Sequence, residues 1–280
     1  MTTPASGAAG QAAAGGQGAA GRTSAGAGAR GDGPAGIGGS RPLGRPGPRR
    51  LAGRRLVGAA LGLVLLGLLV GPLAVLVHDR WAPLLSLDAS TSRAAERLVE
   101  AHPGVLTAAR LVTHLGDPAV VTAGSLLTLV VLLARGARRL ALYVLLVRLG
   151  ALLLSTTVKV AVARARPVFD LPVATAFGYS FPSGHALGGS AFWLSTAVVV
   201  LPLVRSRLRP WLLAGAVLIA VLVAASRVLL GVHYLSDVAA GLVLGFGWTV
   251  LCTYVFALWR REEGRPVAPY EDGLHPELGA

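Results

Sequence analysis

The sequence predicts an all-α fold, a polytopic membrane protein with a bundle of six transmembrane helices. Hydrophobic residues make up 54% of the 280 residues and charged residues only 14%, whereas soluble domains carry about 25% charged residues. The mean hydropathy is +0.64. Long apolar runs recur along the chain with arginines gathered at their ends, which is the pattern of membrane spans and the loops that flank them.

Residues 1–55 are predicted to be a disordered cytoplasmic tail. Of the first 50 residues, 27 are Gly or Ala, so the segment can bury too little apolar surface to offset its ordering entropy. Its end is rich in arginine. Such residues can touch anionic headgroups, but a topology signal is the role that we favour. Residues 261–280, with three prolines, are predicted to be a second disordered tail.

The membrane domain is predicted to cover residues 56–260. Its first apolar run has 22 residues, which is enough to cross about 30 Å of hydrocarbon and too long for a signal-peptide core of about 7–15 residues. The six predicted spans are Leu56–Val77, Pro118–Ala134, Leu140–Val158, Ala186–Val204, Trp211–Ala225 and Val238–Trp259.

Residues 78–117, between the first two spans, mix apolar and charged positions. Ala94, Leu98 and Ala101 recur at helical spacing with Arg and Glu between them, which predicts one or two amphipathic helices at the membrane interface. His114 and Asp117 could belong to a site. We favour a solvated loop or a helix cap for them, because no partner is visible nearby.

The distribution of positive charge predicts the orientation in the membrane. With a cytoplasmic N-terminus and six crossings, the cytoplasmic segments receive 17 of the 26 Lys and Arg residues. The positive-inside rule therefore predicts that both termini are cytoplasmic, in the plasma membrane of the cell. With this orientation, the ends of the last four spans that carry the polar clusters described below are extracytoplasmic.

Arg148 and Cys252 are unusual residues within predicted spans. Arg148 either shares a helix face with Ser155 and Lys159 and points to polar partners, or lies near the cytoplasmic interface if its span begins later. Cys252 is the single cysteine, so neither a disulfide nor a thiolate metal site is expected. It is predicted to pack in the core.

Three polar clusters lie at the predicted extracytoplasmic ends of the spans. They are Lys159 to Pro167, Phe181 to His185, and Ser226 to Asp237. A phosphate group needs fixed cations and N–H donors, and these clusters supply both. Their candidate phosphate-binding residues are Lys159, Arg166, Ser183, Gly184 and Arg227.

The spacing within the clusters suggests how a phosphate would be bound. Lys159 and Arg166 are seven residues apart, two helical turns, so both can face one pocket, and Pro167 then ends the helix. Ser183 is a good N-cap for the following span, where free N–H groups form an anion site. Gly184 allows the backbone to approach the ligand closely.

The two histidines of the clusters divide the chemistry. His233 and Asp237 are four residues apart, on one face if that segment is helical. The carboxylate can then hold one ring N–H and leave the other nitrogen of His233 as a nucleophile. His185 can protonate the departing alcohol and later activate water. One clear carboxylate among an excess of cations would repel a divalent ion, so no metal or other cofactor is expected.

These residues resemble the three signature motifs of the type 2 phosphatidic acid phosphatase superfamily, which also includes vanadium haloperoxidases and glucose-6-phosphatase. Its K-x6-R-P, P-S-G-H and S-R-x5-H-x3-D motifs match without departure. The resemblance implies a six-helix membrane phosphatase without a metal requirement. It also implies that His233 is the nucleophile, that Asp237 orients it, that His185 is the acid and base, and that the other five residues bind phosphate.

The substrate predicted from the clusters is a membrane lipid phosphate. Only 14 residues separate Pro167 from Pro182, which leaves little room for a soluble substrate domain, and a pocket at the lipid bilayer favours an amphiphile. Candidates are phosphatidic acid, phosphatidylglycerol phosphate and polyprenyl diphosphate. Attack by His233 on phosphorus would give a phosphohistidine, which water then hydrolyses. One alternative is a phosphotransferase that passes the phosphoryl group of the same phosphohistidine to an alcohol. Another is a non-catalytic lipid-phosphate binding or transport protein. No nucleic-acid partner is expected, because the +13 net charge lacks a basic face interleaved with aromatic residues.

Overall fold

The structure of the chain is a computed structural model that describes residues 48–167 and 177–262. The chain divides into two units, Met1–Arg45 and Pro46–Ala280. The first unit lies outside the described residues, as do residues 263–280. The predictions of disorder for both tails therefore concern segments that the structure does not describe, apart from residues 48–55 and 261–262, which are helical.

Every regular element in the described ranges is a helix. In chain order they are α1 (Pro48–His78), α2 (Ala82–Ala101), α3 (Pro103–Thr113), the 3₁₀ turn η1 (His114–Gly116), α4 (Pro118–Ala134), α5 (Arg138–Val162), α6 (Gly184–Val200), the 3₁₀ turns η2 (Leu201–Leu203) and η3 (Ser206–Leu208), α7 (Arg209–Leu229) and α8 (Leu235–Glu262).

The prediction of six spans is confirmed. Six helical stretches of the described chain are long and apolar enough to cross a membrane. α4 has the predicted bounds, and four of the other helices begin and end within a few residues of the predicted spans. α1 begins at Pro48, inside the predicted tail. The second apolar stretch begins at Pro103, because α3, η1 and α4 follow one another almost without a break.

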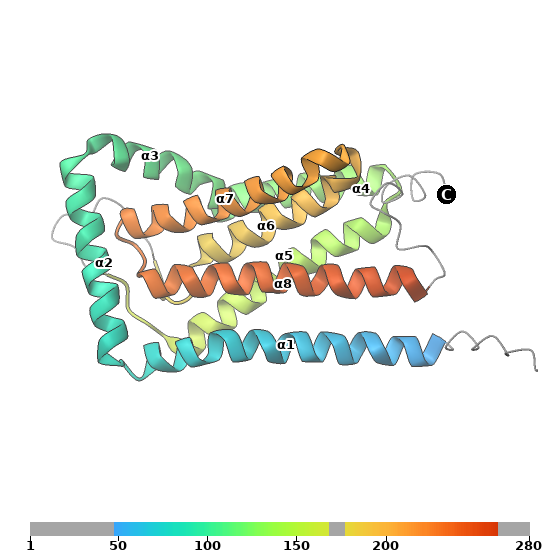
Figure 1. Cartoon of the computed structure of the whole chain (residues 1–280), viewed down its shortest axis with the longest axis horizontal. Coiled ribbons are helices and arrows are strands. Elements are labelled where there is room, and N and C mark those ends of the chain that lie inside the picture. The colour runs from blue at the N-terminus through green and yellow to red at the C-terminus, as the bar shows by residue number, and fades with distance from the viewer. Residues whose placement is uncertain (1–47, 168–176, 263–280) are drawn as a thin grey trace, which may run out of the picture. The chain divides into compact units, whose positions relative to one another are not determined.

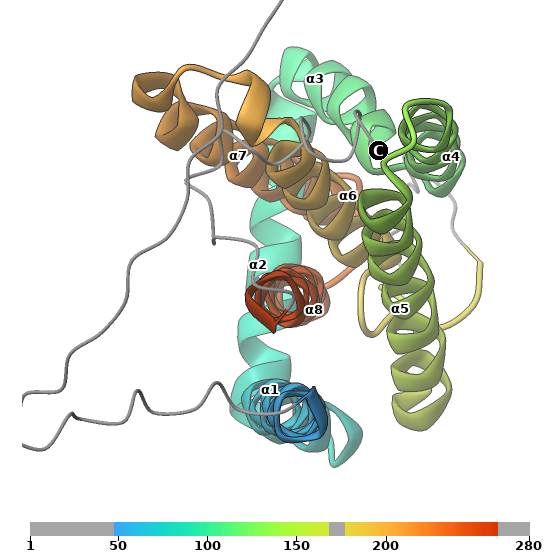
Figure 2. The same cartoon turned by 90° about the vertical axis from the view of Figure 1, so that its right-hand side faces the viewer.

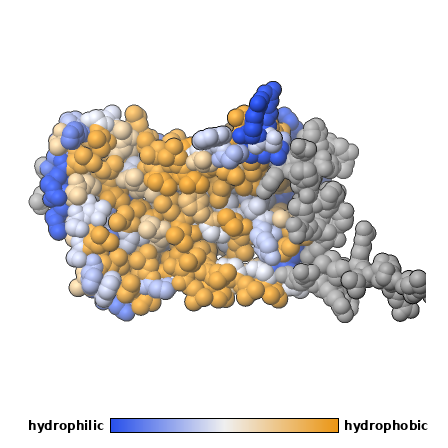
Figure 3. Space-filling view, in the orientation of Figure 1, coloured by the Kyte–Doolittle hydropathy of each residue, from blue (hydrophilic) through white to orange (hydrophobic). Residues whose placement is uncertain are grey.

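The long helices run side by side, and α2 crosses one end of them (Figure 1). Seen along the bundle, α8 lies between α1 and the pair formed by α6 and α7, with α5 beside it (Figure 2). Exposed leucines and valines cover the middle of the bundle between polar ends (Figure 3). This apolar belt is the surface that lipid tails require.

α6 and α8 approach each other closely through two glycines of α8. A Cβ atom on Gly245 would overlap the Ser190 hydroxyl and the Leu187 carbonyl, and one on Gly241 would lie 2.8 Å from the Ser183 carbonyl oxygen. Small residues four apart allow such close packing of membrane helices. Because the second polar cluster immediately precedes α6 and the third precedes α8, this packing also brings the two clusters together.

One or two amphipathic helices were predicted between the first spans, and the structure has two, α2 and α3. The predicted apolar face of α2 is wrong. Ala94, Leu98 and Ala101 are exposed, whereas the face that packs on the bundle carries Asp88, Ser92, Ala95 and Val99. The inner face contains a buried carboxylate that finds polar partners in the bundle, so hydrophobicity alone could not identify it.

Candidate active site

The structure places all three polar clusters at the end of the bundle that α2 crosses. The first follows the end of α5, the second leads into α6, and the third joins the end of α7 to the start of α8. The prediction that they share one end of the bundle is therefore confirmed.

The spacing of Lys159 and Arg166 predicted one continuous helix through the first cluster, and this prediction is wrong. α5 ends at Val162, and Ala163 caps it in the left-handed conformation with φ 50°. The helix thus ends well before Pro167, and Arg166 reaches the site from a non-helical segment. Lys159 reaches it from the last turn of α5, where its Nζ donates a hydrogen bond to the Tyr179 carbonyl at 2.7 Å.

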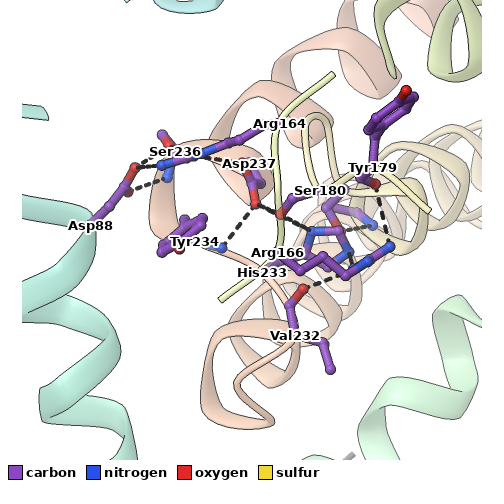
Figure 4. A network of polar contacts seen from close by, with 12 residues as sticks. Asp88, Arg164, Arg166, Tyr179, Ser180, Val232, His233, Tyr234, Ser236 and Asp237 are labelled. Atoms are coloured by element: carbon purple, nitrogen blue, oxygen red, sulfur yellow. Dashed lines mark hydrogen bonds and ion pairs between the residues drawn. The ribbon is translucent and has the colours of Figure 1, made fainter. Parts of the chain in front are cut away.

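Arg166 is held by a set of backbone carbonyls. Its Nε donates to Gly178 O at 2.9 Å, its Nη2 to Phe177 O at 3.0 Å, and its Nη1 to Val232 O at 2.8 Å. Nη1 also lies 3.0 Å from His233 Nε2 (Figure 4). The guanidinium is therefore fixed in place next to the histidine before any ligand arrives.

The second cluster caps α6 as predicted. The Ser183 side chain accepts a hydrogen bond from Ala186 N at 3.5 Å. The backbone N–H of Ser183 donates to Asp237 O at 3.0 Å, which ties the start of α6 to the first turn of α8. A Cβ atom on Gly184 would lie 4.0 Å from Lys159 Cε, so the first two clusters meet here. His185 follows in the first turn of α6, half-buried.

In the third cluster, His233 lies in the turn before α8 and Asp237 in its first helical turn, so the two do not share a helix. They still meet, with His233 Nδ1 3.4 Å from Asp237 Oδ2. The Arg166 N–H points at Nε2, so the ring proton belongs on Nδ1, facing the carboxylate. This tautomer leaves the Nε2 lone pair directed at the cationic side of the site.

Arg227 reaches the same region from the last turn of α7. It is 6% exposed, and its Nη1 donates to the Thr113 hydroxyl at 2.7 Å. Its Nε has no hydrogen-bond partner among the described residues. Arg227 thus lies at the end of α7 that leads into the turn of His233.

Comparisons with known proteins agree with this geometry. A family profile described as "PAP2 superfamily" matches residues 140–261, which contain α5 to α8 and all three clusters. Over these residues the chain is similar to the PAP2 superfamily. It is 38% identical over 97 residues to phosphatidylglycerophosphatase B of Bacillus subtilis (strain 168). That stretch is 33% of this chain and 46% of the relative, so the match spans about half the relative's length.

A solved PAP2 structure has the same fold. It is the crystal structure of a transmembrane PAP2 type phosphatidylglycerolphosphate phosphatase from Bacillus subtilis, with 29% sequence identity and a TM-score of 0.58. The likeness covers 68% of this chain and 94% of that one. Together with the six apolar helices, it identifies this chain as a multi-pass membrane protein.

Sequence reasoning assigned no site role to three residues that the structure places in or against the clusters. Ser180 is fully buried, and its hydroxyl donates a short hydrogen bond to Asp237 Oδ2. Arg164 pairs with Asp237 Oδ1 and with Asp88 Oδ2, each at 2.7 Å. The charge of Arg164 was a visible signal in the first cluster, whereas nothing in the sequence relates Asp88 to a segment so distant along the chain.

The remaining polar residues singled out in the sequence lie where their local structure explains them. Asp117 caps α4, accepting a hydrogen bond from Ala119 N at 2.8 Å, and His114 is exposed in η1. Arg148 turns to a polar partner, with its Nη2 2.7 Å from Thr122 Oγ1 of α4. Cys252 is buried. In the described ranges, no three His, Cys, Asp or Glu side chains gather in a potential metal site.

The environment of His233 predicts a pH dependence of stability. Burial lowers the pKa of His233 from 6.5 to about 4, although the Asp237 hydrogen bond acts in the opposite direction. Between these values the unfolded chain binds more protons than the folded one, so the contribution of His233 to stability falls as the pH falls from about 6.5 to about 4. Above pH 7 it is constant.

Melting temperatures of the purified protein and its His233→Asn variant would measure this effect. The wild-type melting temperature minus that of the variant is expected to be constant above pH 7 and to decrease between pH 6.5 and 4. Asn does not titrate, so the variant lacks this one contribution. A difference that stays the same across the whole range would contradict a neutral, buried His233.

Proposed function

We propose that this chain is an integral membrane phosphatase that hydrolyses a lipid phosphate or polyprenyl diphosphate without a metal ion, through a phosphohistidine intermediate. The observation that carries the proposal is the orientation of His233. Its Nδ1 faces Asp237, while its Nε2 faces Arg166, which backbone carbonyls already hold. A base with a bare nitrogen beside fixed cations suits attack on a phosphorus atom.

In the first step, the Nε2 lone pair of His233 attacks phosphorus, and the bond from phosphorus to the leaving oxygen breaks. Before the attack, Arg166 transfers its hydrogen bond from Nε2 to a phosphoryl oxygen, which frees the lone pair. Lys159 and Arg227 stabilise the charge on the other phosphoryl oxygens. The free N–H groups at the start of α6 donate hydrogen bonds to the same oxygens. His185 gives its proton to the leaving alcohol.

In the second step, His185 removes a proton from water, and the water oxygen attacks phosphorus. The bond between phosphorus and Nε2 breaks, inorganic phosphate leaves, and His233 is restored. While the intermediate exists, its ring carries a positive charge next to Asp237. That carboxylate is fully buried, where an opposite charge is worth more than in water.

The proposed substrate is a lipid because the site lies at an end of the apolar bundle. A headgroup can enter the site while its tail remains beside the exposed leucines of the belt. The Bacillus subtilis relative and the solved structure are both named for phosphatidylglycerophosphate, so this lipid is the first to test. Positive charge gathers at the other end of the spans, at Arg135, Arg138, Arg205 and Arg207, which supports cytoplasmic termini and an extracytoplasmic site in the plasma membrane.

Phosphate release by the purified protein in the presence of EDTA tests the proposal. The panel contains phosphatidylglycerol phosphate, phosphatidic acid, polyprenyl diphosphate and a soluble sugar phosphate. We expect release from at least one lipid, no loss on adding EDTA, and no release by His233→Ala. Release that EDTA abolishes would refute the metal-independent mechanism, and release unchanged in the variant would refute the role of His233.

The same assay also separates the alternatives and tests the orientation. Adding a lipid alcohol as acceptor distinguishes hydrolysis from phosphotransfer, because transfer yields a new phospholipid in place of free phosphate. Lipid added to the outer leaflet of intact spheroplasts should release phosphate into the medium. Release only after the cells are opened would place the site on the cytoplasmic side.

A further inference from the structure

Asp88 is the only fully buried carboxylate of α2, and it lies outside residues 140–261, which the PAP2 profile matches. It is 1% exposed and faces the bundle together with Ser92, Ala95 and Val99. A buried carboxylate is costly unless it is paired and hydrogen-bonded. The hydrogen-bond and ion-pair partners of Asp88 therefore indicate its role in the structure.

Asp88 acts as a cap for α8, although it belongs to another helix. Its Oδ1 accepts a hydrogen bond from the backbone N–H of Ser236 at 3.0 Å, and its Oδ2 accepts one from the Ser236 hydroxyl at 2.5 Å. Ser236 is the second residue of α8, where N–H groups have no partner within the helix. A carboxylate at this position is also favoured by the helix dipole. Asp88 thus fixes the turn that carries Asp237.

Arg164 connects this cap to the proposed catalytic carboxylate. Its Nη2 donates to Asp88 Oδ2 at 2.7 Å, and its Nη1 donates to Asp237 Oδ1 at 2.7 Å (Figure 4). Nη1 also lies 2.7 Å from the Ser236 hydroxyl, and the guanidinium stacks over the Tyr234 ring at 4.0 Å. The planar guanidinium is therefore held on both edges and on one face.

The arrangement divides the two oxygens of Asp237 between two tasks. Oδ1 is held by Arg164, whereas Oδ2 receives the Ser180 hydroxyl, the Tyr234 N–H at 2.9 Å, and His233. One guanidinium between two carboxylates leaves one net negative charge. If Asp88 were neutral, Arg164 would cancel the charge of Asp237, and the carboxylate would stabilise a positively charged His233 less well.

We propose that Asp88 and Arg164 are positioning residues that hold Asp237 in place and preserve its negative charge for the phosphohistidine step. The inference rests on the proposed function, since it assigns Asp88 a role through Asp237 and His233. It also gives α2 a part in the reaction, as the element that fixes the start of α8 from outside the three signature clusters.

The test compares Asp88→Asn with the wild type in steady-state hydrolysis of the best lipid of the panel. We expect kcat to fall by about 10- to 100-fold, which is the loss seen when a residue that orients a metal ligand is removed. KM should change by less than about threefold, because Asp88 contacts none of the phosphate-binding residues. Glu100→Gln, which removes an exposed carboxylate from the same helix, is the matched control and should keep the wild-type kcat.

A double-mutant cycle with Arg164→Gln separates this role from a purely structural one. If Asp88 acts through Arg164, then Asp88→Asn should lower kcat far less in the Arg164→Gln background than in the wild type. The proposal would be overturned if the fold-decrease in kcat of the double variant equalled the product of the two single fold-decreases. It would also be overturned if Asp88→Asn had the wild-type kcat. A loss of activity explained entirely by a smaller folded fraction would also overturn it.

Asp88→Glu provides a second variant in case Asp88→Asn does not fold. It retains the charge but moves the carboxylate by one methylene, so kcat should fall severalfold with KM unchanged, and an unchanged kcat would overturn the proposal. His233→Asn distinguishes failure of this inference from failure of the proposed function. Activity lost in His233→Asn but retained in Asp88→Asn refutes only the positioning role, whereas activity retained in both refutes the histidine mechanism.

Discussion

Replacing His233 by Asn is expected to lower kcat for lipid phosphate hydrolysis by about 10⁴-fold or more, the loss typical of removing one member of a coupled catalytic unit. Asn remains polar but has no basic ring nitrogen, so no bond to phosphorus can form. Arg166 and Lys159 stay bound to backbone carbonyls, so KM should change much less than kcat. Steady-state kinetics of the purified variant measure both quantities.

The matched control for this substitution is His102→Asn. His102 joins α2 to α3 at the same end of the bundle, and its side chain is exposed, so its loss should leave kcat unchanged. Rapid quenching of the wild type with a substrate labelled in its phosphate should also trap a labelled protein that is stable in alkali and labile in acid. Labelling that persists in His233→Asn would assign the nucleophile to another residue.

Replacing His185 by Gln is expected to have an effect that depends on the leaving group. With a lipid phosphate, whose alkoxide needs a proton to leave, kcat should fall by about 10²- to 10⁴-fold, the usual contribution of general acid–base catalysis. With an aryl phosphate such as 4-nitrophenyl phosphate, the phenolate leaves without a proton, so the first step should continue. The second step should slow, because no base activates water.

A burst of nitrophenol followed by slow turnover would reveal this difference. The labelled phosphoprotein should accumulate in His185→Gln and should be absent from the double variant with His233→Asn. An equal loss with both leaving groups, without a burst, would contradict the role of His185 as acid and base. His114→Gln is a suitable control, because His114 is exposed in η1, close to the same end of the bundle.

The sequence by itself determined the number and the approximate bounds of the membrane helices. Transfer of a helix into lipid depends on the summed hydropathy of about 20 consecutive residues, and this sum can be read from a window of sequence. The cap at Ser183 was predictable for a similar reason, because an N-cap bonds to a backbone N–H two or three residues further along. Successive spans cross the membrane in opposite directions, so counting the spans was enough to predict that the three clusters lie at one end.

Tertiary structure alone decided which polar groups meet at that end. α5 ends at the left-handed Ala163, so Arg166 reaches His233 from a non-helical segment and not from the same helix face as Lys159. Asp88 lies 76 residues from Arg164 and 148 from Ser236, and it lies on the buried face of α2, which is not the face predicted to be apolar. Contacts of this kind depend on how helices pack and on which buried charges find partners. These are properties of the whole assembled bundle, and no local stretch of sequence contains them.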